Sequence, residues 1–238
     1  QMAGDNICLV YPAKDYVFTD IEGASYEYEH RRLDVLSRLL SGKCRIVVAS
    51  IEAVLQKTIS KERLNESIVT LKQGDDIEIK ELLSKLVSIG YSRADEKVEG
   101  AAQFSARGSI VDIFPVQSSM PVRIEFWGDT IDSISYFDVE SQRRNEKIPE
   151  ISVSPAIEVV CDAETLISKI EEFSNGVKGK HAEDIKNKLS EDIDKLQNGV
   201  TLNSRDKYLV ISDTPATLFD YINGIVCISE IKNIIERA

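Results

Sequence analysis

The middle of the chain carries two short stretches that decide its fold: QFSARGSIVDIFP at residues 103–115 and PVRIEFWGD at residues 121–129. Within the second stretch, apolar and polar side chains alternate with a period of two, which is typical of a strand with one buried face. Gly128 and Asp129 then separate two strand-like runs, so we expect a hairpin there. The pattern predicts a compact, mainly antiparallel β-rich unit of α+β type over residues 89–155.

The period of two also sorts the side chains of residues 122–127 onto two faces. The apolar face, which we expect to join the core, carries Val122, Ile124 and Phe126. The opposite face, which we expect to be the more exposed, carries Arg123, Glu125 and Trp127. Trp and Arg are enriched at protein–protein hot spots, which favours an interaction surface. An arginine stacked on the tryptophan for packing alone is an equal alternative on these residues.

The flanking regions have the texture of a parallel α/β fold. Continuous apolar runs at residues 7–11 and 46–49 are typical of strands buried on both faces, and a helical pattern starts at Glu29. Ser50 is a plausible N-cap for a helix over residues 51–57. Further runs predict a strand at 67–71 and a helix from Ile79 to Gly90. We therefore expect an α/β body split into residues 1–88 and 156–238, with the β-rich unit inserted at 89–155.

The second part of this body should contain two helices, two strands and two shorter helices. The apolar spacing predicts helices over residues 163–173 and 180–198, and buried strands over 208–211 and 224–228. A helix with Pro215 at its first position should lie between these strands, and a terminal helix should follow the second.

Composition limits the classes of function. The 238 residues contain 40 acidic and 29 basic side chains, a formal net charge of −11, which argues against a protein that grips nucleic acid by bulk charge. No apolar run approaches the length of a membrane span. The four cysteines are too far apart for a CxxC pair, so we expect reduced thiols in a cytoplasmic protein. The residue ahead of Met2 suggests a piece of a longer protein.

Motifs of catalysis and cofactor binding are missing from the sequence. It contains no GxxxxGK[ST] phosphate loop, no GxGxxG and no GxSxG, and its histidines are limited to His30 and His181. We expect both histidines to be surface residues without a role. The sequence therefore predicts no catalytic residue, no cofactor and no metal site in this chain.

Several stretches resemble the amino-terminal module of bacterial transcription-repair coupling factors. The resemblance is strongest over residues 91–155, where it rests on residues 90–93, 103–115 and 121–129 quoted in part above. It is fair over residues 7–90, through Tyr11-Pro12 and the segments 32–36 and 47–50, and weak after residue 160. It implies a degenerate helicase-like α/β body, similar to part of the excinuclease protein UvrB, that carries an inserted domain.

The same resemblance implies a function and a site. In the family the inserted domain docks onto the excinuclease protein UvrA, and the docking positions fall on Arg107, Arg123 and Trp127, where the aromatic residue is often phenylalanine. The chain would then be a non-catalytic adaptor that links stalled transcription to nucleotide excision repair. The full-length family member would add RNA polymerase and DNA as partners, a DNA-translocating ATPase motor, and a carboxy-terminal domain that masks the docking surface.

Two alternatives stay open. The chain could be a fragment of the excinuclease protein UvrB or of another ATP-dependent DNA helicase, but it lacks the phosphate loop, and residues 14–28 are too short for the tyrosine-rich DNA hairpin. An ATPase assay with DNA distinguishes that alternative. A direct DNA-binding module using Arg107, Arg143 and Arg144 is the other, and a salt-dependent mobility shift tests it.

Overall fold

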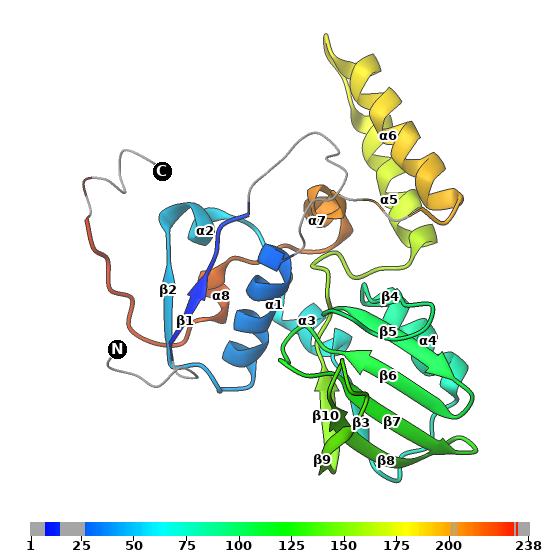
Figure 1. Ribbon diagram of the computed structural model, residues 1–238. Coiled ribbons are helices and arrows are strands. Elements are labelled where there is room, and N and C mark those ends of the chain that lie inside the picture. The colour runs from blue at the N-terminus through cyan, green and yellow to red at the C-terminus, as the bar shows by residue number, and fades with distance from the viewer. Residues whose placement is uncertain (1–7, 15–26, 201, 203, 231, 233–238) are drawn as a thin grey trace.

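The computed structural model describes residues 8–14, 27–200, 202, 204–230 and 232, which form a mixed α/β structure with parallel and antiparallel strand pairs (Figure 1). The first elements are β1 (Cys8–Tyr11), α1 (Glu27–Leu40), β2 (Ile46–Ala49), α2 (Ile51–Leu55) and α3 (Lys61–Ser67). The middle elements are β3 (Val69–Lys72), α4 (Ile79–Ser88), β4 (Ser92–Arg93), β5 (Gln103–Arg107), β6 (Ile110–Phe114), β7 (Val122–Trp127), β8 (Thr130–Phe137), β9 (Arg144–Ile148) and β10 (Glu150–Val153). The last are α5 (Ala163–Gly176), α6 (Ala182–Gln197), a 3-10 turn (Arg205–Tyr208), α7 (Leu209–Ser212) and α8 (Leu218–Tyr221).

The middle of the chain forms a six-stranded sheet in the order β4-β5-β6-β7-β8-β9. The β4–β5 pair is parallel and all the other neighbours are antiparallel, as the alternating pattern predicts. Gly128 has a φ of +63° in the turn between β7 and β8, which confirms the predicted hairpin. In the register of this sheet, Arg123 lies between Asp112 on β6 and Ser135 on β8.

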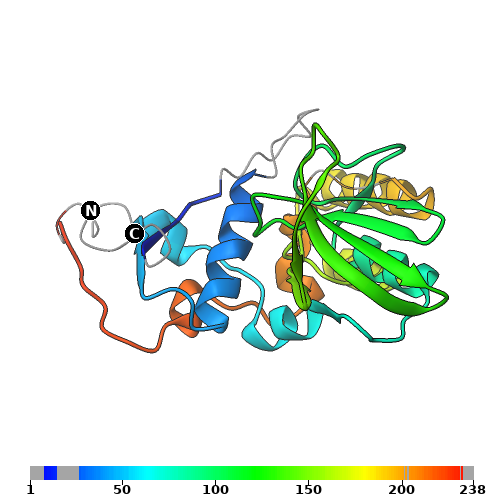
Figure 2. The same cartoon turned by 60° about the horizontal axis from the view of Figure 1, so that its bottom comes forward.

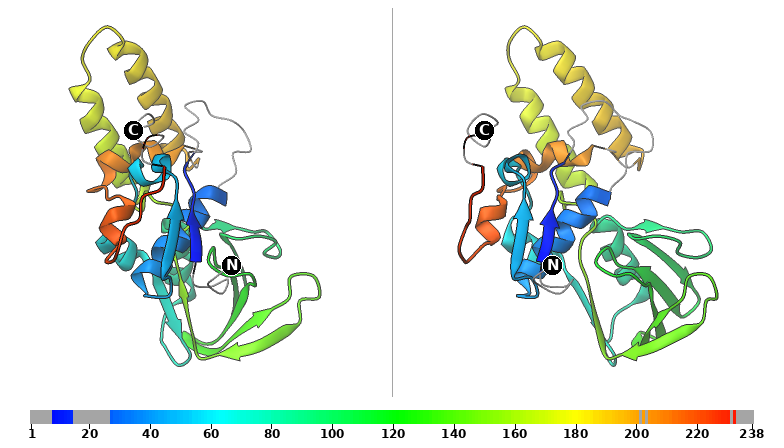
Figure 3. Two further views of the ribbon diagram at one scale, coloured as in Figure 1. Left: turned by 90° about the vertical axis from the view of Figure 1, so that its left-hand side faces the viewer. Right: turned by 60° about the vertical axis from the view of Figure 1, so that its left-hand side comes forward.

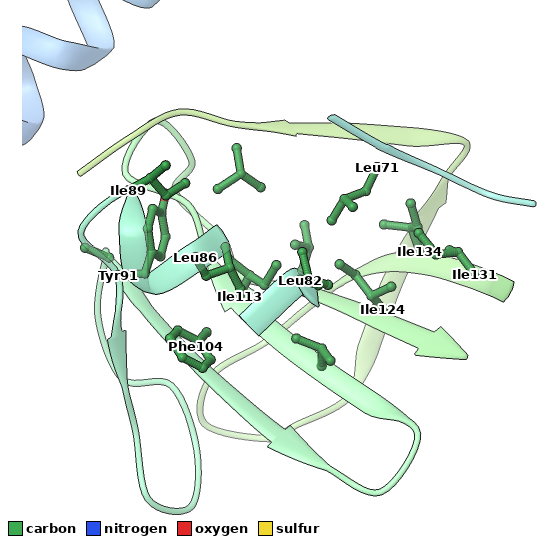
Figure 4. Close-up of a cluster of buried hydrophobic side chains, with 14 of the residues drawn as sticks. Leu71, Leu82, Leu86, Ile89, Tyr91, Phe104, Ile113, Ile124, Ile131 and Ile134 are labelled. Atoms are coloured by element: carbon green, nitrogen blue, oxygen red, sulfur yellow. The ribbon is translucent and has the colours of Figure 1, made fainter. Parts of the chain in front are cut away.

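One apolar cluster fills the space between this sheet, helix α4 and the small β3–β10 sheet (Figure 4). Val122, Ile124 and Phe126 belong to it, so the predicted core face of β7 is confirmed. Leu82 and Leu86 of α4 also belong to it, which groups this helix with the sheet and not with the body. The division of the chain at residue 88 stays a prediction, but core packing favours a boundary ahead of β3.

The body that precedes the sheet is built on a two-stranded parallel sheet, β1 paired with β2. Helix α1 packs against it through Leu33 and Leu36, which are fully buried. The predicted cap of α2 is confirmed, because the Ser50 hydroxyl accepts a hydrogen bond from the Ala53 amide at 3.3 Å. Helix α3 was not expected from the sequence, and the strand expected at 67–71 begins two residues later.

The structure corrects the sequence-based prediction for the end of the chain. Residues 208–211 are not a strand: they end a 3-10 turn and form α7, because Tyr208 and Leu209 pack onto the α5–α6 helix pair and not into a sheet. Pro215 does not begin a helix, since α8 starts at Leu218, after its N-cap Thr217.

Residues 224–228 are also not a strand, because they pair with no neighbouring backbone among the described residues. The helix expected after them lies largely outside the described residues. The parallel sheet of the body therefore has two strands in the part of the chain that the structure describes. In that same part, no helix is both long and apolar enough to cross a bilayer.

The chain returns from the sheet to α5 through residues 154–162, here called the linking segment (Figures 2 and 3). Its Ala156 amide donates to the carbonyl of Ile89 at 2.8 Å, and its Ile157 side chain packs over Gly90. Gly90 has a φ of +93°, and a Cβ there would lie 2.7 Å from Ile157, so both the backbone and the packing require glycine. The linking segment is thus packed against the end of α4.

Candidate functional site

Trp127 is the most exposed aromatic side chain among the large hydrophobic residues that the structure describes, with 84% of its surface accessible. It ends β7, directly before the turn at Gly128. The amide of its neighbour Phe126 donates to the carbonyl of Ser109 at 2.9 Å, which places the β5–β6 turn beside the end of β7. The side chains of Arg107 and Trp127 therefore belong to the same end of the sheet, as the sequence predicted for a common surface.

Asp112 organises the two predicted arginines. Its carboxylate accepts two hydrogen bonds from Arg123, from Nε at 2.7 Å and from Nη2 at 2.8 Å. A third bond comes from Arg107 Nη2 at 2.8 Å. Asp112 is 1% exposed, so the paired arginines are what allow this carboxylate to stay ionised inside the protein. We call Arg107, Asp112 and Arg123 the sheet cluster.

Arg123 does lie on the predicted face of β7, but the expectation that it is exposed there is wrong. It is 9% exposed, because the guanidinium stacks on the Phe137 ring at 4.4 Å and also donates to Gln142 Oε1 at 2.9 Å. The hydrogen bond to Asp112 is the main reason that the pKa of Arg123 lies above its ordinary value. Arg123 thus supports the surface from beneath.

Arg107 differs from Arg123, because half of its side chain remains exposed and its bond to Asp112 uses only Nη2. Beside it, Glu125 accepts from Ser133 Oγ at 2.8 Å and pairs with Arg144. The polar face of the sheet is therefore internally paired, and Arg107 and Trp127 are the predicted site residues that extend into solvent. This arrangement can offer a partner one directed cation and one large aromatic surface.

Sequence reasoning missed Asp112 as a member of the site. The signal was present, since Asp112 is the one charged residue within the apolar run IVDIF. Its role depends on strand register, which places Asp112 directly opposite Arg123.

Neither predicted histidine joins this surface. His181 lies at the amino-terminal end of α6, and His30 lies on α1, where burial lowers its pKa to about 4. The expectation that His30 is a surface residue is therefore not met. Among the described residues, no three His, Cys, Asp or Glu side chains are grouped as a metal site would need.

Comparison with known proteins adds independent information. The family model of the UvrB interaction domain matches residues 69–158. The transcription-repair-coupling factor of Bacillus subtilis (strain 168) is 34% identical over 98% of this chain, and that of Staphylococcus aureus (strain bovine RF122 / ET3-1) is 29% identical over 95%. The chain spans about a fifth of the length of these relatives, 21% and 20%. By sequence, therefore, this chain is homologous to the amino-terminal module of bacterial transcription-repair coupling factors.

Proposed function

We propose that this chain is a non-catalytic adaptor module that binds the excinuclease protein UvrA in nucleotide excision repair. The observation that carries the proposal is the 84% exposed Trp127 beside the half-exposed Arg107, at one end of the sheet that lies within the UvrB interaction domain. In the longer protein the module would recruit UvrA to stalled transcription. There RNA polymerase, DNA and a masking carboxy-terminal domain would be further partners, and the body would be a degenerate helicase-like fold around the inserted domain.

The chemistry of the surface specifies the partner surface it would fit. An indole supplies a large apolar area at a low cost in side-chain entropy, so the partner should offer an apolar pocket. Arg107 keeps its Nε and Nη1 donors directed away from its bond to Asp112, which suits a carboxylate on the partner. Asp112 and Arg123 fix the direction of Arg107 before binding, which lowers the ordering cost of association.

Calorimetric titration of this chain with purified UvrA tests the proposal. Trp127→Ala and Arg107→Ala should each weaken binding about tenfold or more, which is about 1.4 kcal/mol. Phe173→Ala and Arg45→Ala are matched controls, because both side chains are exposed but lie outside the sheet. The controls should bind as the unaltered chain does.

Two results would contradict the proposal. One is the absence of binding by a well-folded unaltered chain. The other is equal weakening by the site and control variants, which would place the contact elsewhere. Arg123→Ala is read separately, since its effect on folding has to be measured before its effect on binding is interpreted.

A further inference from the structure

A second buried carboxylate lies between two cations, outside the sheet cluster. Glu158, in the linking segment, accepts from Lys14 Nζ at 2.9 Å and from Arg32 Nε at 3.0 Å. The Arg32 and Glu158 side chains are completely buried, and 8% of the Lys14 side chain is exposed. Burial by itself would raise the pKa of Glu158, but the two cations bring it below its ordinary value, so the carboxylate is charged. We call Lys14, Arg32 and Glu158 the body cluster.

The cationic half of this cluster is fixed in place by the body alone. Arg32 Nη1 donates to the carbonyl of Pro12 at 2.9 Å and to Gln56 Oε1 at 3.1 Å, and its guanidinium stacks on Tyr11 at 4.3 Å. Gln56 Oε1 also accepts from the Lys14 amide at 2.7 Å, and its Nε2 donates to the Lys14 carbonyl at 2.8 Å. These bonds arrange Lys14 and Arg32 as a pair of donors without help from Glu158.

The position of the pair in the fold is one where α/β proteins bind ligands. Lys14 follows the carboxyl end of β1, and Gln56 follows α2, which begins directly after β2. Arg32 lies in the amino-terminal half of α1. Open parallel sheets bind ligands beyond the carboxyl ends of their strands, and the positive end of a helix dipole favours an anion there. The sequence has no phosphate loop at this position, and two cationic side chains occupy it.

We propose that Lys14 and Arg32 form an oxyanion site of the body, which the chain fills with the carboxylate of its own Glu158. Such a pair can bind a carboxylate or a phosphate, since both groups present oxygen acceptors to cationic donors. The inference is independent of the partner that the sheet binds.

Occupation of this site by Glu158 fastens the linking segment to the body. The Glu158 amide donates to Glu29 Oε1 at 2.8 Å, and two residues later the Val160 carbonyl accepts from Arg63 Nη2 at 2.6 Å. Asp206 lies near the same site, 3.8 Å from Lys14 Nζ. The internal carboxylate thus joins the segment that leaves the sheet to α1 and the residues after β1, and it excludes an external oxyanion from the same donors.

Removal of the Glu158 side chain, with an added small oxyanion as replacement, tests the site. Glu158→Ala should lower the melting temperature by roughly 10 °C, because it leaves two buried cations without their partner. Sodium acetate or inorganic phosphate should then restore several degrees of that loss when ionic strength is held constant with sodium chloride. The unaltered chain, whose site is filled, should gain much less from either salt.

Glu150→Ala is the matched control, because Glu150 is an exposed carboxylate that also pairs with a lysine, Lys72. The proposal is overturned if acetate and phosphate stabilise Glu158→Ala no more than they stabilise Glu150→Ala or the unaltered chain.

A second pair of variants keeps the test decisive if Glu158→Ala does not fold. Glu158→Gln preserves the volume of the side chain but removes its charge, so it should lower the melting temperature. Adding Lys14→Met to it should return part of the loss, because the uncompensated buried cation is removed. Simple addition of the two separate losses would show that Lys14 and Glu158 do not act on one another, and would overturn the proposal.

Discussion

The sheet cluster and the body cluster use the same chemistry for different ends. Each sets one buried carboxylate between two cations, Asp112 in the first and Glu158 in the second. In the sheet cluster, half of the Arg107 side chain reaches solvent, whereas in the body cluster Arg32 is fully buried and Lys14 is 8% exposed. A pairing that stays open at one edge can present a cation to a partner, while a closed one can only fasten two parts of the chain together.

The energetic consequence follows from solvent access. Removing one member of a closed pair leaves an uncompensated charge in a medium of low polarity, which costs several kcal/mol. Removing a half-exposed member costs little, because water replaces the lost partner. The comparison therefore predicts that stability should respond most in the body cluster and partner binding most at the sheet.

The largest effect is expected from Arg32→Met. It leaves Glu158 with Lys14 as its one remaining cationic partner, and should lower the free energy of unfolding by about 3–5 kcal/mol. Urea titration followed by circular dichroism measures this. Arg31→Met is the control, since Arg31 pairs with Glu27 where both side chains are more than 60% exposed, and the change should stay within about 0.5 kcal/mol. Equal losses for the two variants would remove the distinction between closed and open pairs.

Arg123→Met is expected to follow, with a loss of about 3 kcal/mol. The loss should be smaller than for Arg32→Met, because Arg107 still pairs with Asp112. Replacing Asp112 as well, in the double variant Arg123→Met with Asp112→Leu, should recover part of the loss, since no buried charge then remains unpaired at β6. A double variant less stable than the sum of the two single ones would contradict this account of Arg123.

Trp127→Ala should separate binding from stability. We expect binding to UvrA to weaken by about 2 kcal/mol or more, roughly 30-fold, as at a central aromatic hot spot. The free energy of unfolding should change by no more than about 0.5 kcal/mol, because the side chain is exposed. Calorimetry and urea titration of the same preparation give both numbers. A large loss of stability would mean that the indole packs in the fold and is not presented to a partner.

Arg107→Ala should weaken the same binding by about 1.4 kcal/mol, a factor of ten. Its effect on unfolding should be below about 1 kcal/mol, because the residue is half exposed and Asp112 keeps Arg123. The loss of binding should shrink as salt is raised, since an exposed cation is screened. An effect that does not depend on salt would argue against a charged contact at this position.

The dependence of stability on pH is expected to respond to Glu29, which adjoins the body cluster. Burial first, and then the nearby Glu158 charge, raise the pKa of Glu29 from its ordinary 4.5 to about 7, although Lys14 opposes the shift. A carboxyl whose pKa is raised by folding contributes stability that is present at low pH and is lost as pH rises through the folded value.

Glu29→Gln should therefore gain stability relative to the unaltered chain as pH rises from 4.5 to about 7, and should show no further relative change above that. The variant keeps an oxygen that can accept from the Glu158 amide. Urea titrations at several pH values measure the difference, and a difference that is constant across this range would contradict the assignment.

The accuracy of the sequence analysis varied along the chain for a physical reason. The strands of the sheet were predictable because each has a local signal: alternation in β7, a glycine turn after it, and proline after β6. Residues 208–211 have the same apolar composition as a strand, and the choice between strand and helical turn was made by the α5–α6 helices that they contact. Short apolar runs do not specify their own secondary structure.

The candidate site shows the same limit. The sequence placed Arg123 and Trp127 on one face of β7, since side-chain direction follows from the period of the strand. It did not distinguish the buried arginine from the exposed tryptophan. That difference comes from Asp112, Phe137 and Gln142, which reach Arg123 from other parts of the chain.

By itself, the sequence determined the alternating sheet, the face that carries the proposed docking residues, and the absence of a phosphate loop, because each depends on neighbours a few residues apart. The tertiary structure decided which charges are buried and with whom they pair. Glu158 lies 126 residues from Arg32 along the chain, and Asp112 lies 11 from Arg123. Such pairings follow from strand register and packing, since burial is a property of the folded surroundings and not of a residue's own segment.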